Sequence, residues 1–317
     1  MTTRQHNTID PAKLDKLAEV AVKVGLQLQP GQDVFLTAPA AALPLVRRIA
    51  EHAYKAGAGL VTPLLSDEEV TLARYRFGQD AGFDRAAGWL YEGLAKAFDA
   101  NTARLAVVGD NPMLLAGEDA AKVARASKAN SIAYRPAMEK ITGFDINWNI
   151  VAYPGASWAR LVFPDDEEDA AVGKLADAIF AASRADVADP VAAWTAHNAA
   201  LRARTDWLNG QRFHALHYSG PGTDLTIGLA DGHEWVGGAS VARNGIVCNP
   251  NIPTEEVFTT PHAQRVEGHV RSTKPLSYQG TLIDDIAVRF EGGRIVEASA
   301  SRGAEVLNKV LDRKSVV

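Results

Sequence analysis

Two adjacent carboxylates, Glu255 and Glu256, lie inside a short run of β-prone residues from Thr254 to Thr260. Prolines stand at both ends of this run. Because proline cannot donate to a sheet ladder, Pro253 and Pro261 are predicted to mark where strand pairing starts and stops. Side chains alternate across a strand, so the two glutamates are expected to face opposite ways.

The two faces of this predicted strand decide what each glutamate could do. One carboxylate can face solvent at little cost, whereas the one that shares a face with Phe258 would lie against packed structure or in a cleft. A carboxylate in such a place needs a cation, a hydrogen-bond donor or a metal ion as its partner. The alternative is that both glutamates lie on an exposed edge, and the spacing by itself leaves both interpretations open.

Histidines supply further candidate ligands. His262 follows Pro261 and could reach a site near Glu256, whereas His214 and His217 lie on a predicted strand where they point to opposite faces. The sequence contains no His-Glu-x-x-His, which argues against a thermolysin-type zinc helix, and no Gly-x-Ser-x-Gly nucleophile elbow. Lys274 is a candidate contact to a substrate carboxylate, but we expect it to be a solvated lysine.

Composition narrows the class of protein. A net charge of -5 disfavours nucleic acid as a partner. No apolar run reaches the roughly 18 residues that span a bilayer, and the polar stretch of residues 1–10 is not a secretory signal. The single cysteine, Cys248, cannot form an intramolecular disulfide, which fits a cytoplasmic protein. We expect Cys248 to be a small buried group rather than a nucleophile.

The pattern of elements predicts two domains. Asp10 is placed to cap a helix that begins at Pro11. Strands and helices then alternate, which predicts an α/β domain with a largely parallel sheet over residues 1–188. Short alternating runs separated by glycine turns predict a β-rich, antiparallel domain over residues 189–317. We expect the metal site in this second domain.

The alternation of strands and helices in residues 1–188 could also suggest a nucleotide-binding α/β protein. The strand at 104–109 ends in Gly109-Asp110-Asn111-Pro112, which has neither the Gly-x-Gly-x-x-Gly nor the P-loop pattern. A strand that ends in a tight turn is therefore expected there. In an open sheet, any ligand would still lie near the carboxyl ends of the strands.

The run from Cys248 to His262 resembles the metal-site segment of the aminopeptidase T family of thermophilic metallopeptidases, peptidase family M29. The resemblance identifies the second glutamate of Pro-Thr-Glu-Glu-Val-Phe-Thr, here Glu256, as a metal ligand. Glu255 and His262 are secondary candidates because of their positions near Glu256 in the sequence. Further matching stretches lie along almost the whole chain. They are Trp89–Gly93, Ala133–Pro136, Asp189–Trp194 and Gly222–Leu229.

The resemblance also implies an activity. Members of the family remove N-terminal residues from peptides with a pair of divalent metals, for which zinc, cobalt and manganese are suitable. In such a site one metal polarises the scissile carbonyl and both bind the nucleophilic water. The resemblance further implies an α/β N-terminal domain, a β-rich C-terminal domain, and a homodimer that encloses the active sites.

The chain departs from the family pattern after the last predicted helix. The family continues there into a Gly-Glu motif with a second metal-binding glutamate, followed by histidine and aspartate ligands and a catalytic tyrosine. Residues 313–317 do not match that continuation, so we expect a C-terminally truncated chain with an incomplete β-rich domain. Two functions follow as hypotheses: a metal-dependent aminopeptidase, or an inactive truncated homologue that folds, dimerises or binds peptide without turnover.

Overall fold

The computed structural model describes residues 8–278 and 281–314, with side chains up to Leu311. These residues form two compact units. The first runs to Ala200 and includes Gly238–Glu255, and the second contains Leu201–Gly237 and the described residues from Glu256 onward. The boundary falls inside helix α8 (Pro190–Gln211). The division into domains at residues 188 and 189 stays a prediction. No helix of the described part is long and apolar enough to cross a membrane.

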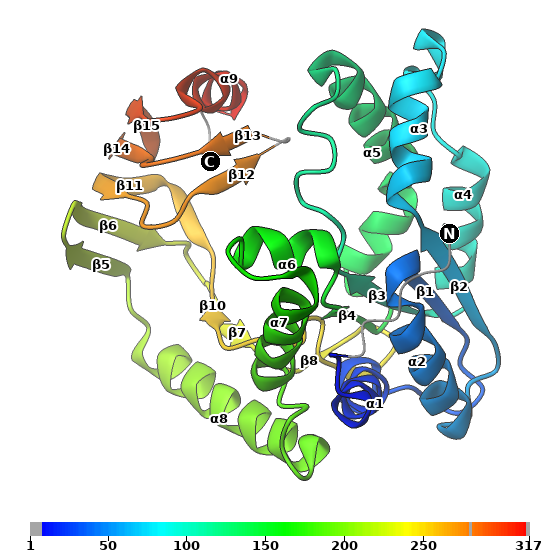
Figure 1. Ribbon diagram of the computed structural model, residues 1–317. Helices are drawn as coiled ribbons and strands as arrows, with labels where there is room; N and C mark the ends of the chain where they lie inside the picture. Colours follow the sequence, from blue (N-terminus) through cyan, green and yellow to red (C-terminus); the bar gives the residue numbers. More distant parts are fainter. Residues whose placement is uncertain (1–7, 279–280, 315–317) are drawn as a thin grey trace. The chain divides into compact units, whose positions relative to one another are not determined.

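The first unit is organised around a four-stranded sheet in the order β2-β1-β3-β4 (Figure 1). Its strands are β1 (Val34–Pro39), β2 (Val61–Ser66), β3 (Ala103–Val108) and β4 (Trp148–Ala152). All three pairings are parallel, which confirms the predicted α/β class. The strand order reverses direction between β1 and β3, as in doubly wound folds.

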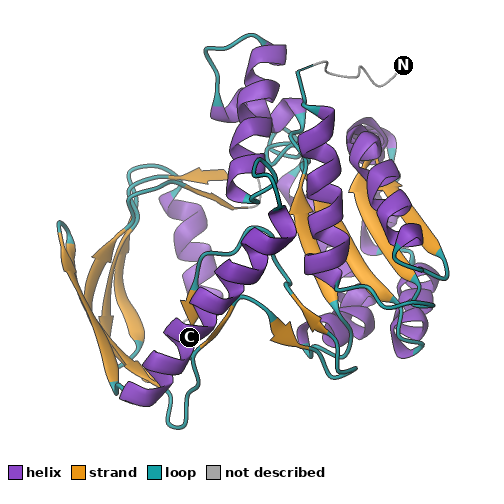
Figure 2. Cartoon of the chain, turned by 90° about the horizontal axis from the view of Figure 1, so that it is seen from below, coloured by secondary structure: helices purple, strands orange, loops and turns teal. Residues whose placement is uncertain are grey.

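Alternation along β1 explains why helices cover both faces of this sheet (Figure 2). Val34 and Leu36 belong to one buried apolar cluster, which also contains residues of α1 and α2. Phe35 points the other way into a second cluster with Leu94 of α4 and Ile141 of α5. The helical segments of the unit are α1 (Pro11–Val20), a π-helical turn (Ala21–Leu26), a 3-10 turn (Ala40–Ala42), α2 (Leu43–Lys55), α3 (Glu68–Phe77), a 3-10 turn (Asp80–Asp84), α4 (Gly88–Asp99), α5 (Ala120–Thr142), α6 (Ala156–Val162), α7 (Glu168–Ala182) and the first part of α8.

Local signals for α1 are borne out at its start. The Asp10 side chain accepts hydrogen bonds from the backbone N–H groups of Ala12 at 2.8 Å and Lys13 at 3.3 Å. After Val20 the helix widens into the π-helical turn, where Gly25 meets the side chain of Asn149 from β4. A Cβ atom at Gly25 would lie 2.4 Å from Asn149 Cγ, so only glycine permits this approach.

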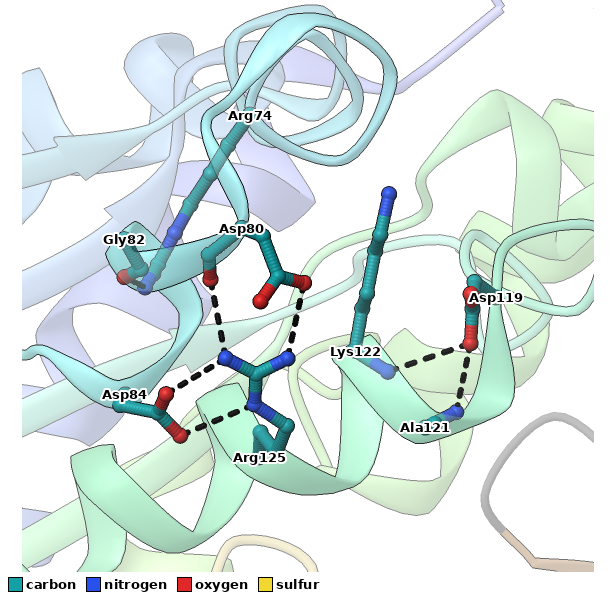
Figure 3. Close-up of polar contacts among 8 residues, drawn as sticks. All are labelled: Arg74, Asp80, Gly82, Asp84, Asp119, Ala121, Lys122 and Arg125. Carbon is teal, nitrogen blue, oxygen red and sulfur yellow. Dashed lines mark hydrogen bonds and ion pairs between the residues drawn. The ribbon is translucent and has the colours of Figure 1, made fainter.

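Arg125 of α5 ties the 3-10 turn at Asp80–Asp84 to this helix (Figure 3). Its Nη1 donates to Asp80 Oδ1 at 2.8 Å and its Nε donates to Asp84 Oδ1 at 2.9 Å. Two cations contact the ring of Phe83, which is buried: Lys122 Nζ lies 5.3 Å and the Arg74 guanidinium 5.8 Å from the ring centroid. This turn is therefore anchored by charge and by packing.

The second unit contains an antiparallel five-stranded sheet in the order β15-β14-β11-β6-β5. A two-stranded pair, β7 with β10, and another, β12 with β13, complete its strands, and α9 packs against β13 and β15. This confirms the predicted β-rich region. The element bounds are β5 (Ala215–Gly220), β6 (Thr223–Leu229), β7 (Val236–Gly237), β10 (Val257–Phe258), β11 (Pro261–Arg271), β12 (Leu276–Tyr278), β13 (Thr281–Ile283), β14 (Ala287–Glu291), β15 (Arg294–Ser299) and α9 (Ala304–Lys314); the short pair β8 (Ser240–Val241) and β9 (Val247–Cys248) belongs to the first unit.

Candidate active site

The segment that leads into the two glutamates is built into the first unit. Asn249 donates its backbone N–H to Gly25 O at 2.9 Å, and its carbonyl accepts from Asn149 Nδ2 at 2.7 Å. Its side-chain amide exchanges two hydrogen bonds of 2.9 Å with that of Asn198 on α8. The edge strand β4 then pairs with the next residues, because Ile150 N donates to Pro250 O at 2.8 Å. Asn249 is 1% exposed, so these bonds replace water completely.

Glu255 is held by two residues that the sequence did not single out. Arg184 Nη1 lies 2.7 Å from Glu255 Oε1, and the same guanidinium stacks 5.0 Å from the ring of Trp194. His197 Nε2 lies 2.7 Å from Thr254 O, so this nitrogen must donate. Its Nδ1, 3.1 Å from Arg184 Nη2, must then accept. The two residues therefore hold both the side chain of Glu255 and the backbone just before it.

Sequence reasoning missed these two residues because only a weak signal marks one of them. Trp194 and His197 are three apart on a predicted helix, which puts their side chains on one face, and their rings are 5.4 Å apart. Arg184 follows the end of α7 in a left-handed conformation, with φ 56°. No spacing rule connects a residue of that loop to a glutamate 71 positions later.

Glu256 lies directly before β10 in the second unit, and its side chain is exposed. Strand β10 pairs antiparallel with β7, with Val257 opposite Gly237. A Cβ atom at Gly237 would lie 2.5 Å from Glu256 O, so glycine lets the two backbones approach here. Glu256 makes no side-chain hydrogen bond or ion pair with any described residue, which leaves its carboxylate open to a cation.

The strand expected over Thr254–Thr260 is shorter than predicted. Only Val257 and Phe258 pair, and Pro261 begins β11, where it stands opposite Leu229, instead of ending a strand. The alternation rule therefore does not apply to the two glutamates, because neither lies in a strand. Their different surroundings come from the contacts of Glu255.

His262 is half-buried near the start of β11. Its Nδ1 accepts a hydrogen bond from Gln264 N at 3.2 Å, and no hydrogen bond joins it to Glu256 within the described residues. The pKa of Asp231 is lowered chiefly by hydrogen bonding to Arg265 and by the Arg265 charge, with smaller contributions from His262 and His214.

Residues 8–278 and 281–314 do not by themselves form a metal centre. No group of three histidine, cysteine, aspartate or glutamate side chains in this part could hold a metal ion. The expected ligand Glu256 is a single side chain, whereas a catalytic zinc usually takes three protein ligands. Cys248 is no substitute, because it is fully buried and its burial raises the pKa of the thiol. This confirms the sequence interpretation of Cys248.

The second unit also contains a cavity of about 580 Å³. It is lined by the end of α8 and the residues that follow it, by the end of β6 and the turn between β6 and β7, and by Arg265 of β11. Arg265 Nη1 and Nη2 bind the two oxygens of Asp231 at 2.7 Å and 3.2 Å. No pattern in the sequence indicated that Arg212 and Glu234 would line the same space.

Comparison with known proteins settles the family. The model of a thermophilic metalloprotease family, peptidase M29, matches residues 10–315. The chain belongs to this family. This match confirms the family that the motif around Glu256 predicted. Because M29 is a family of metalloproteases, membership implies a divalent metal.

Three relatives show how far the likeness to M29 proteins extends. Aminopeptidase T of Thermus thermophilus is 53% identical over 299 residues, which cover 94% of this chain and 73% of that protein. Aminopeptidase 2 of Geobacillus stearothermophilus is 40% identical, over 95% of this chain and 73% of its own length. The solved structure of wild-type AmpT from Thermus thermophilus has a TM-score of 0.91 and 51% identity, and the match covers 96% of this chain and 75% of that one.

Proposed function

We propose that this chain is a metal-dependent aminopeptidase, which releases N-terminal amino acids from peptides. The observation that carries the proposal is the likeness to relatives named aminopeptidases, at 53% identity over 94% of the chain for one of them. The M29 family adds the requirement for a divalent metal. Zinc, cobalt or manganese, two per subunit, are the ions that the resemblance implies.

The roles of the motif residues follow from their surroundings. Glu256 is the proposed metal ligand, because its exposed carboxylate has no partner among the described residues. Glu255 is engaged with Arg184, so its part is to hold the segment that carries Glu256. His262 remains a secondary candidate for the metal.

The test is turnover of leucyl- and arginyl-p-nitroanilide by the whole chain. EDTA should abolish release of the nitroaniline, and zinc, cobalt or manganese should restore it. Glu256→Gln should lower kcat/KM by at least about a hundredfold, because loss of a ligand exceeds the roughly 10–100-fold effect of losing a supporting partner. Glu305→Gln, an exposed glutamate of α9, is the matched control. Turnover that survives both EDTA and Glu256→Gln would contradict the proposal.

The alternative is an inactive homologue that folds, dimerises or binds peptide without turnover. It is favoured by one observation, that the described residues contain no complete group of metal ligands. Calorimetric titration with Zn²⁺ or Co²⁺ separates the two functions. Tight stoichiometric binding of the metal together with turnover excludes the alternative. Peptide binding without metal binding and without turnover supports it.

A cytoplasmic homodimer is the proposed form of the protein. The first unit exposes several large apolar side chains, among them Phe77 at 84% and Trp89 at 76%, which association could cover. Light scattering on the purified chain measures the mass directly. A monomer at concentrations well above micromolar would exclude the dimer.

A further inference from the structure

One side chain joins two walls of the cavity in the second unit. Asn209, near the end of α8, donates from Nδ2 to Trp235 O at 3.0 Å, and its Oδ1 accepts from Trp235 N at 2.7 Å. Arg212 follows three residues after Asn209, and Glu234 directly precedes Trp235. These paired bonds therefore hold the segment that carries Arg212 at a set spacing from the segment that carries Glu234.

Arg212 and Glu234 are the charged residues of this cavity that have no side-chain partner among the residues that the structure describes. Asp231 and Arg265 neutralise each other through their two hydrogen bonds. Arg212 and Glu234 both line the cavity, but within the described part of the chain neither side chain has a hydrogen bond or ion pair, and they do not pair with one another. Both side chains are exposed, so each charge is accessible to a ligand in the cavity.

The other lining groups suit a peptide. His233 Nδ1 lies 2.9 Å from Ala230 O and must donate to it, so in the neutral imidazole Nε2 is left as an acceptor. Phe213 and Leu229 add apolar surface. The volume of about 580 Å³ lies within the roughly 300–1,000 Å³ of sites for small ligands. A ligand that carries an ammonium group, a carboxylate and an apolar side chain would meet a partner for each.

We propose that this cavity binds a short peptide with both ends free. Arg212 receives the carboxylate, Glu234 and His233 Nε2 receive the ammonium group, and Phe213 and Leu229 contact the side chains. The inference deepens the proposed function by naming a second place where peptide is bound, and it rests on that function for the source of the peptide. Binding itself requires neither the metal nor Glu256.

The experiment measures binding to the whole chain by calorimetry in the presence of EDTA. The probes are leucyl-leucine, N-acetyl-leucyl-leucine, which lacks the ammonium group, and leucyl-leucinamide, which lacks the carboxylate. Each blocked peptide should bind about 10- to 100-fold more weakly, the range expected when one charge-assisted hydrogen bond is lost. Equal affinities of the three peptides, or no saturable binding of leucyl-leucine, would overturn the proposal.

Two variants assign the ends of the peptide. Arg212→Gln should weaken leucyl-leucine binding to the level of leucyl-leucinamide and leave binding of the amide unchanged. Glu234→Gln should weaken leucyl-leucine binding to the level of N-acetyl-leucyl-leucine and leave binding of the acetylated peptide unchanged. Arg294→Gln on β15 and Glu305→Gln on α9, both exposed and outside the cavity, are the controls. Losses that are the same for all three peptides contradict the assignment.

The outcomes separate this inference from the aminopeptidase proposal. If leucyl-leucine binds through Arg212 but no metal restores turnover, the cavity stands and the enzyme proposal fails. If Glu256→Gln abolishes turnover while Arg212→Gln leaves peptide affinity unchanged, the enzyme proposal stands and the cavity inference fails.

Discussion

Arg125 lowers the pKa values of two carboxyl groups, those of Asp80 and Asp84. Its guanidinium contacts Asp80 and Asp84, and in each carboxyl group the hydrogen bond to Arg125 is the largest cause that lowers the pKa. A lowered pKa in the folded chain means that folding favours the ionised form. The stabilisation is therefore complete above the ordinary value of 3.8 and is lost as the pH falls through the lowered pKa.

Replacing Arg125 should make the acid dependence of stability shallower. We expect Arg125→Met to have a lower Tm at neutral pH and a smaller further decrease between about pH 5 and pH 2 than the unchanged chain. Thermal melts followed by circular dichroism across this range measure both effects. Arg243→Met, at a side chain that is 75% exposed, is the control. Parallel pH curves for Arg125→Met and the unchanged chain would show that the pair does not contribute.

At the scale of elements, two glycines allow the chain segments after β3 and β4 to cross closely. A Cβ atom at Gly155 would lie 2.0 Å from Gly109 O, and one at Gly109 would lie 2.3 Å from Tyr153 O. The crossing is closed by Tyr153 N, which donates to Val108 O at 2.7 Å. The sequence predicted the turn after β3, but the need for glycine at 155 arises from the neighbouring strand.

Gly155→Ala should therefore destabilise the first unit. The added methyl group meets backbone, which cannot move aside as a flexible side chain can, and overpacking of this kind costs about 1–3 kcal/mol. Urea unfolding measures the change in the free energy of unfolding. Gly93→Ala in α4 is the matched control, because a Cβ atom there has no neighbour within 4 Å and alanine favours a helix. A loss no larger than that of Gly93→Ala would argue against the close crossing.

At the scale of the whole molecule, the two units differ in how much apolar surface each one buries. Both large clusters of buried side chains belong to the first unit. The second unit has fewer fully buried apolar residues among those described, including Leu225, Leu229, Val266 and Ile283. Since buried apolar area is the main source of stability, the second unit is expected to be the weaker one.

Hydrogen exchange at increasing urea concentration tests this difference. Amides of β6, β11 and β14 should lose protection at lower urea than amides of β1 and β3, because their unit opens before the rest of the chain unfolds. The readout is mass spectrometry of peptides from each sheet in the same sample. Simultaneous loss of protection in both sheets would mean that the chain unfolds as one cooperative unit.

The sequence by itself determined what depends on near neighbours along the chain. The cap at Asp10, the short alternating runs of the β-rich region and the family motif around Glu256 are all local patterns. Tertiary structure alone decided the surroundings of the candidate site. Arg184 meets Glu255, and Arg212 shares a cavity with Glu234, because separate segments fold against one another, and no periodicity within either segment records that meeting.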